Sequence, residues 1–426
     1  MTEVTDRATF RQVLAVPVFR ALFWCRALAI GADTLRTVAL SVLVFAQTGS
    51  AFLGAMTFGI SFLPQVIGGV VIGALPDLVR PRPLIVGGYL LEAAGAAVLA
   101  LAGLPVWASL VLVAAIGCLA PVFNGTAGKL TADSLSGDAF VLGRSLFQLA
   151  VSSAQLVGLA AGGIAVAAVG AQHALLITAG CHLVAALGSR LGLPDLPAPG
   201  RDGDRSLLGR SWRVNGELLR DPVVRRLMLI MWLPPAFITG AESLLVPYTA
   251  LRGLPAGAPG LLLACVPVGM IAGNFVTARV LSPATRERAV PLLVAVLGAP
   301  LLGFAFDIGV VVLGALLVVV GFGFGFGMGI QRPFRDAVPT AVRGQAFGLM
   351  STGLMTLQGV GPTLFGLAAE FVPVGIAMAC GGVATLLTAA WIAFGSRPER
   401  QNERQGGRPG TIESENAGSQ NTANQR

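Results

Sequence analysis

The sequence predicts an all-α integral membrane protein with twelve transmembrane helices in two pseudo-symmetric six-helix bundles. Three observations predict this fold class. The composition, 54% hydrophobic and 12% charged with a mean hydropathy of +0.78, is too apolar for a soluble domain of this length. Long apolar runs recur along the chain, and its second half repeats features of its first half.

The apolar runs have the length of membrane-spanning helices. Each has roughly 18 to 30 residues, enough to cross about 30 Å of hydrocarbon at about 1.5 Å per residue. Half of them precede a long polar segment and half follow it. We place the twelve runs at residues 19–45, 51–75, 84–104, 106–123, 140–169, 174–193, 227–250, 260–281, 289–306, 308–330, 345–371 and 373–394.

The polar segment at residues 194–226 is rich in arginine, with prolines and glycines at its head, and is typical of a solvated linker. Within it, leucines and a tryptophan between 207 and 219 favour a helix on the membrane surface. Asp221 and Pro222 should cap and open the next helix. The predicted organisation is an N-terminal bundle (1–193), this linker, a C-terminal bundle (227–395) and a disordered tail (396–426).

The two halves read as copies of one unit. An offset of about 203 residues aligns Gln155 with Gln358, and residues 31–33 (Gly-Ala-Asp) have a counterpart at 240–242 (Gly-Ala-Glu) if one extra turn is allowed. A duplicated membrane unit with a site between its copies is the usual plan of a secondary transporter.

The net charge of +8 follows membrane topology rather than a nucleic-acid surface. With twelve spans and both termini on one side, all basic residues except Arg26, Arg36 and Arg252 fall on that side or at helix ends facing it. The positive-inside rule then predicts a multi-pass protein of the cell membrane with both termini and the linker in the cytoplasm. No nucleic-acid partner is expected.

The chain lacks the usual signals of an enzyme. Its five cysteines sit singly in apolar runs, and no nucleophile has a neighbouring base. No glycine-rich phosphate loop precedes the only lysine, Lys129. We expect no catalytic residues, no metal and no cofactor.

Several charged residues fall inside predicted spans. The first run carries Arg26, Asp33 and Arg36, and a charge near the bilayer centre costs at least about 2.5 kcal/mol, so these residues should face a partner or a wet cavity. A bland alternative is that Asp33 and Arg36 only neutralise each other. For Glu92 in the third run, a pairing role and a role in transport stay equally open.

Polar residues on other spans predict the rest of a substrate cavity. On the fifth span, four polar residues follow one another at spacings of four, four and three, which places them on one helix face. The second half adds two polar residues on predicted inner helices. The predicted cavity residues are Arg26, Arg36, Arg144, Gln148, Ser152, Gln155, Asn274 and Gln358.

The segment from Gly73 to Arg82 resembles the loop between helices 2 and 3 of the major facilitator superfamily, roughly G-x-L-x-D-R-x-x-R-R. Gly73, Leu75, Asp77 and Arg82 match, while Leu78 replaces the first arginine and Pro81 another. The resemblance implies the major facilitator fold. It also implies that Asp77, Arg80 and Arg82 form a cytoplasmic latch of the outward-facing state.

Other segments are similar to the drug and siderophore exporter branch of that superfamily. They lie at residues 19–24, 37–40, 47–51 and 338–348, and residues 158–163 resemble the antiporter signature G-P-x-x-G-G with Leu159 for proline. The resemblance implies a monomeric efflux antiporter of the multidrug-resistance type in the lipid bilayer. Its partners would be a small amphipathic substrate and a proton. An importer of a small metabolite and a non-transporting receptor remain alternatives.

Two acids at matching places in the two halves, Asp33 and Glu242, are the candidates for carrying the coupling proton. Asp33 has Arg36 one turn away and should stay ionised, whereas Glu242 has no basic residue within two turns and is the better proton carrier. We assign no role to His173 and His182. The Pro234-Pro235 pair should break the backbone hydrogen-bond ladder of the seventh span.

Overall fold

The computed structural model describes residues 9–72, 79–135, 137–197, 206–255, 257–339 and 342–395, and these residues form helices and short connections without a strand. The predicted disordered tail lies outside them. The helices are α1 (Phe10–Ala15), α2 (Pro17–Thr48), α3 (Ala51–Gly59), α4 (Leu63–Ile72), α5 (Pro81–Leu101), α6 (Val106–Ser134), α7 (Gly137–Gly192), α8 (Ser206–Arg220), α9 (Pro222–Glu242), α10 (Leu245–Leu251), α11 (Ala258–Arg279), α12 (Pro283–Gly298), the 3-10 helix η2 (Ala299–Ala305), α13 (Val310–Gly323), α14 (Phe326–Ala337), α15 (Arg343–Ala368) and α16 (Val374–Gly395).

These helices make twelve membrane segments. Ten are long and apolar enough by length and composition alone. Gly170, at a left-handed φ of 82°, divides α7 into two segments, and α15 supplies the remaining one. Some spans consist of two short helices, such as α3 with α4 and α13 with α14. The predicted twelve-helix fold class is confirmed.

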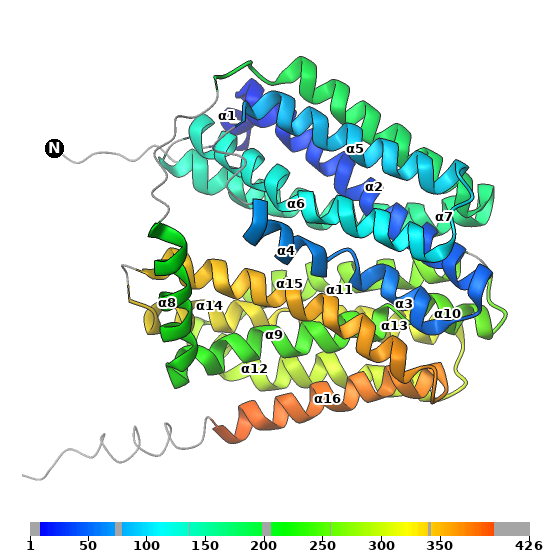
Figure 1. Cartoon of the computed structure of the whole chain (residues 1–426). Helices are drawn as coiled ribbons and strands as arrows, with labels where there is room; N and C mark the ends of the chain where they lie inside the picture. The colour runs from blue at the N-terminus through cyan, green and yellow to red at the C-terminus, as the bar shows by residue number, and fades with distance from the viewer. Residues whose placement is uncertain are drawn as a thin grey trace, which may run out of the picture.

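Figure 1 shows the two halves as two bundles, with α2, α5, α6 and α7 above, α9 and α12 to α16 below, and α3 and α4 between them. The same close approach occurs in both. A Cβ on Gly158 of α7 would lie 2.6 Å from the Gly31 carbonyl of α2, and one on Gly361 of α15 would lie 3.3 Å from the Gly240 nitrogen of α9. Glycine is needed at 158 and 361 because the helix backbones nearly touch. The repeat seen in the sequence is therefore a structural repeat.

Part of the predicted linker is helical and docks on the C-terminal bundle. Leu218 of α8 is buried in that bundle's core, and Gln345 of α15 donates a hydrogen bond to Asn215 at 2.9 Å. The Asp221 carboxylate accepts hydrogen bonds from the Val223 and Val224 amides at 2.8 and 2.9 Å, which is the predicted cap of α9.

The Pro234-Pro235 pair lies inside α9 (Pro222–Glu242) and does not end it. α9 continues through both prolines, which are buried, and ends at Glu242; the chain resumes as α10 at Leu245. Buried prolines are tolerated within membrane helices because close packing and local adjustment compensate for the missing backbone hydrogen bonds. The interruption therefore falls directly after the buried acid.

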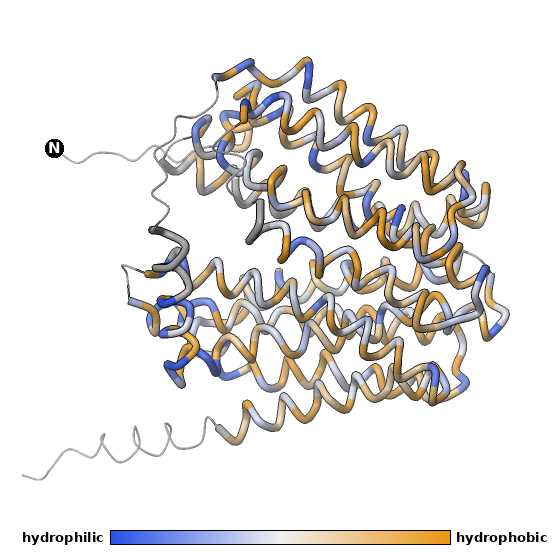
Figure 2. The backbone as a smooth tube through the Cα atoms, viewed as in Figure 1, coloured by the Kyte–Doolittle hydropathy of each residue, from blue (hydrophilic) through white to orange (hydrophobic). Residues whose placement is uncertain are grey.

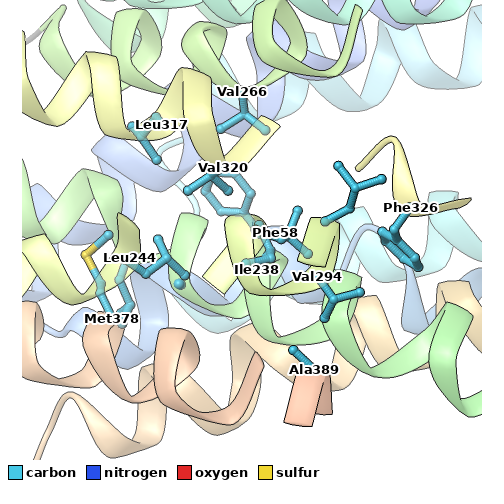
Figure 3. Close-up of a cluster of buried hydrophobic side chains, with 14 of the residues drawn as sticks. Phe58, Ile238, Leu244, Val266, Val294, Leu317, Val320, Phe326, Met378 and Ala389 are labelled. Carbon is cyan, nitrogen blue, oxygen red and sulfur yellow. The ribbon is translucent and has the colours of Figure 1, made fainter. Parts of the chain in front are cut away.

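The largest apolar core belongs to the C-terminal bundle, where Ile238, Leu244, Val294 and Phe326 pack together (Figure 3). Phe58 of α3 joins this core, so the N-terminal bundle inserts a side chain into its partner. Apolar residues also run along the outer surfaces of the helices (Figure 2). An apolar exterior is expected where the solvent is lipid.

The bundles contact each other at the end remote from α8. A Cβ on Gly163 of α7 would lie 2.6 Å from the Gly257 carbonyl. Glu370, after α15, accepts hydrogen bonds from the Ser50 hydroxyl at 2.7 Å and the Phe52 amide at 2.9 Å at the start of α3. These hydrogen bonds join the described parts of the two bundles. This end is closed.

Candidate functional site

A polar cavity of about 260 Å³ lies in the N-terminal bundle and reaches α15 of the other bundle. Helices α2, α4, α5, α6 and α7 supply its walls, and Met355 of α15 closes it from the second half. Its polar and charged lining consists of Arg26, Asp33, Gln65, Tyr89, Glu92, Gln155 and His182.

Arg36 of α2 is buried behind this lining, with 8% of its surface exposed, and contacts two of the carboxylates that line the cavity. Its Nη2 lies 3.2 Å from Asp33 Oδ1, one turn earlier on the same helix, and its Nη1 donates a hydrogen bond to Glu92 Oε2 of α5. One guanidinium thus serves two carboxylates. A buried arginine is stable here because each of its two terminal nitrogens, Nη1 and Nη2, is paired with a carboxylate.

His182 of α7 completes the group of side chains that we call the charge cluster: Asp33, Arg36, Glu92 and His182. The imidazole is 1% exposed, and its Nε2 lies 3.4 Å from Asp33 Oδ1. Neither ring nitrogen forms a hydrogen bond with a described residue. The ring stacks on Tyr89 of α5 at 6.3 Å between centroids.

Asp33 connects the charge cluster with the cavity. Its Oδ1 is buried against Arg36 and His182, yet the side chain as a whole is 35% exposed. Since Asp33 lines the cavity, that exposed part faces it. Arg26, on the same helix as Asp33, also lines the cavity. Among the described residues, no carboxylate lies within 4.0 Å of the Arg26 guanidinium.

The predicted cavity residues are only partly brought together. Gln155 lines the cavity beside Arg26 and Asp33. Gln358 instead donates a hydrogen bond to Thr239 Oγ1 at 3.4 Å, and Asn274 is half-buried on α11 away from this lining. The side chains of Arg144, Gln148 and Ser152 lie outside the described part of α7.

Glu242, the counterpart of Asp33, has a different environment. It ends α9, and its Oε1 is buried without a hydrogen-bond partner in the described chain. A buried carboxylate without a counter-charge is stable as the neutral acid and costs several kcal/mol as the anion. Asp33 and Glu242 thus differ among the described residues: Asp33 is paired with Arg36, and Glu242 Oε1 has no hydrogen-bond partner.

Of the predicted latch, Gly73 and Asp77 lie outside the described residues. Arg80 Nη1 is 3.9 Å from Asp195 Oδ2, and both side chains are exposed. Arg82 and Arg190 line the same surface hollow of about 490 Å³.

Asp33, Glu92 and His182 also place three possible metal-ligand atoms within 4.8 Å of one another. Arg36 already binds both carboxylates of that set. A divalent cation would add two charges beside Arg36 and near Arg26, which the two carboxylates alone would not offset. The donor set therefore suits a proton better than a metal ion.

Sequence reasoning missed the place of His182 and Tyr89 in this site. An ionisable group inside an apolar run is itself a functional signal, and His182 carries that signal as Asp33 does. The signal is easily missed because the partners of His182 lie on α2 and α5, far away in sequence.

Solved transporter structures share this architecture. A mutant of the nucleoside transporter NupG has a TM-score of 0.71 at 12% identity, covering 88% of this chain and 99% of that one. A bacterial homolog of the human lysosomal transporter Spinster, inward-facing and unoccupied, gives 0.66 at 14%, covering 88% and 94%. A mutant of the peptide transporter POT, in complex with alafosfalin, gives 0.70 at 14%, covering 93% and 96%.

No curated protein matches the sequence. The described helices, their repeat and the cavity beside the bundle interface agree with one family, whose match spans residues 22–334 and so covers most of the chain. The protein belongs to the Major Facilitator Superfamily, whose members are transporters and not enzymes.

Proposed function

We propose that this transporter exports a small amphipathic compound, such as an antibiotic or a secondary metabolite, in exchange for protons. The observation that carries the proposal is the charge cluster, three of whose members line a cavity that lies in the N-terminal bundle and reaches α15. Ionisable groups inside a membrane are costly and mark substrate or proton paths. Asp33 offers one side to that cluster and the other to the cavity.

In this proposal the two acids have separate tasks. Glu242 carries the coupling proton, because an unpaired buried carboxylate can exist neutral and can ionise when the bundles move and water reaches it. Asp33, held by Arg36, shapes the polar site where substrate binds, together with Arg26 and Gln155.

The protein acts as a monomer in the cell membrane, with both termini and the linker in the cytoplasm. Under the positive-inside rule, the closed end with Glu370 then faces outward. In the opposite conformation Asp77, Arg80 and Arg82 would form the cytoplasmic latch. Asp77→Asn should then reduce transport with little loss of folded protein.

An importer of a small metabolite is the second candidate. The likeness to a nucleoside transporter and a peptide transporter favours it, as does the polar lining of a cavity of only about 260 Å³. A non-transporting receptor has less support, since no large extra domain is attached to the described membrane helices.

Growth of a deletion strain on a compound panel separates these candidates. Export predicts hypersensitivity to the transported compound and its rescue by the wild-type protein but not by Asp33→Asn. Loss of growth on one nutrient, with unchanged drug sensitivity, would favour import and contradict export.

A further inference from the structure

His182 is the buried titratable group that the proposed function leaves unused. Its Nε2 faces Asp33 Oδ1 at 3.4 Å, and neither of its ring nitrogens has a hydrogen-bond partner among the described residues. An imidazole always carries at least one N–H, so a fully buried and unpartnered ring is costly. That cost calls for a protonation state that the surroundings stabilise.

The charged and titratable neighbours come from two helices. From α2 these are Arg26, Asp33 and Arg36, and from α5 they are Tyr89 and Glu92. The cavity-lining residues of α4, α6 and α15 contain none.

The direct contacts leave a negative charge to be balanced. Asp33 and Glu92 carry two negative charges when ionised, and Arg36 supplies one positive charge between them. Arg26 is farther away, without a carboxylate within 4.0 Å among the described residues. A proton on His182 would make the charge cluster neutral and would give Asp33 a counter-charge of its own.

This inference rests on the proposed proton coupling. We propose that His182 is a second proton-binding group, and that its protonated form replaces Arg36 as the counter-charge of Asp33. When His182 is neutral, Arg36 neutralises Asp33. When a proton from water in the cavity binds His182, the imidazolium pairs with Asp33 and Arg36 pairs with Glu92 alone. Because Asp33 also faces the cavity, substrate there meets an acid whose partner depends on that proton.

The chain offers a direct test because it has only two histidines. His173 is exposed, with Nδ1 2.9 Å from the Val169 carbonyl, and lies away from the cavity, so it is the matched control. Full-length protein with ¹³C-labelled histidine should give two imidazole signals by NMR. His173→Gln removes one signal and identifies the other without altering the charge cluster.

The His182 signal is followed from about pH 5 to pH 8. We expect it to change with pH, and Asp33→Asn to alter that change, because the substitution removes the carboxylate that faces the imidazole. The His173 signal should not respond to Asp33→Asn. A His182 signal that stays constant over this range, or that titrates identically in Asp33→Asn, would overturn the inference.

The titration needs no substrate and no transport, so its outcome is separate from that of the proposed function. If His182 titrates as expected while transport proves independent of the pH gradient, the proton site stands and the proposed coupling fails. His182 itself is not replaced in the titration, so a folding defect cannot mimic the negative result.

Discussion

The carboxylate of Asp33 is buried on one side, 3.4 Å from His182 Nε2, and faces the cavity on the other. The side chain therefore lies between a group that can bind a proton and the space where substrate can bind. Any change at Asp33 should affect both.

Asp33→Asn should reduce transport by about tenfold or more while leaving the protein folded. The loss of one charge-assisted contact of about 1.5 kcal/mol corresponds to roughly a factor of ten. Arg36 keeps Glu92 as a partner, so stability should change little. Initial transport rates and thermal unfolding in detergent measure the two effects. A variant that transports at the wild-type rate would remove Asp33 from the site.

Arg36→Met should be strongly destabilising because it leaves two carboxylates, Asp33 and Glu92, without their shared cation. Removing one partner of a buried pair typically costs about 3 to 5 kcal/mol. Adding Glu92→Gln should restore part of the loss, since one of the orphaned charges is then gone. Unfolding temperatures of the single and double variants provide the test. If the double variant is less stable than Arg36→Met, Glu92 does not depend on Arg36.

Glu370 should hold the end of the molecule remote from α8 closed in a pH-dependent manner, and we propose that this end faces outward. The Phe52 amide and the Ser50 hydroxyl lower the pKa of this exposed carboxyl, which lies beyond the end of α15. A lowered pKa means that the contact is complete above the usual carboxyl pKa and is lost as the pH falls through the lowered value. Acid outside the cell, or Glu370→Gln, should therefore favour opening.

Labelling of a cysteine introduced at Ala55, which is buried between α3 and α15, reports that opening in a cysteine-free background. Its reaction with a membrane-impermeant maleimide should rise in Glu370→Gln. Asp307→Asn is the matched control, because Asp307 pairs with Arg252 at the same end but within one bundle. Equal labelling in both variants would show that Glu370 does not join the bundles.

Gly163→Ala should prevent complete closure of the same end, remote from α8. A Cβ at Gly163 would lie 2.6 Å from the Gly257 carbonyl, and backbone atoms cannot move aside as a side chain can. Gly180→Ala, also on α7, is the control, because a Cβ at Gly180 would have no neighbouring atom within 4 Å. Labelling at position 55 should increase for the first variant only. Unchanged labelling in Gly163→Ala would mean that α7 and α11 can move apart to admit the added methyl group without opening this end.

Much of the fold follows from local sequence properties. Apolar runs predict the spans because, in lipid, the backbone must form its hydrogen bonds within a helix. The repeat is visible in the equivalent close contacts at Gly158 and Gly361. Pro234 and Pro235 each lack a backbone N–H donor, which the sequence shows, but the continuation of α9 through them to Glu242 could not be predicted locally.

The site depends on contacts that no local pattern contains. Asp33 and Arg36 share one helix and could be paired by spacing, but Glu92 and His182 reach them only through the packing of α5 and α7 on α2. The contact of Glu370 with Ser50 likewise joins residues more than three hundred positions apart. Such pairs require the tertiary structure.

Proton-driven accumulation in inverted membrane vesicles tests the proposed coupling most directly, with a compound that the sensitivity panel has identified. An imposed pH gradient should drive uptake by the wild-type protein and by His173→Gln, while Glu242→Gln should lose the gradient-dependent part. Asp33→Asn should lower uptake by weakening the substrate site. If Glu242→Gln keeps gradient-dependent accumulation and Asp33→Asn abolishes it, the roles of the two acids must be exchanged.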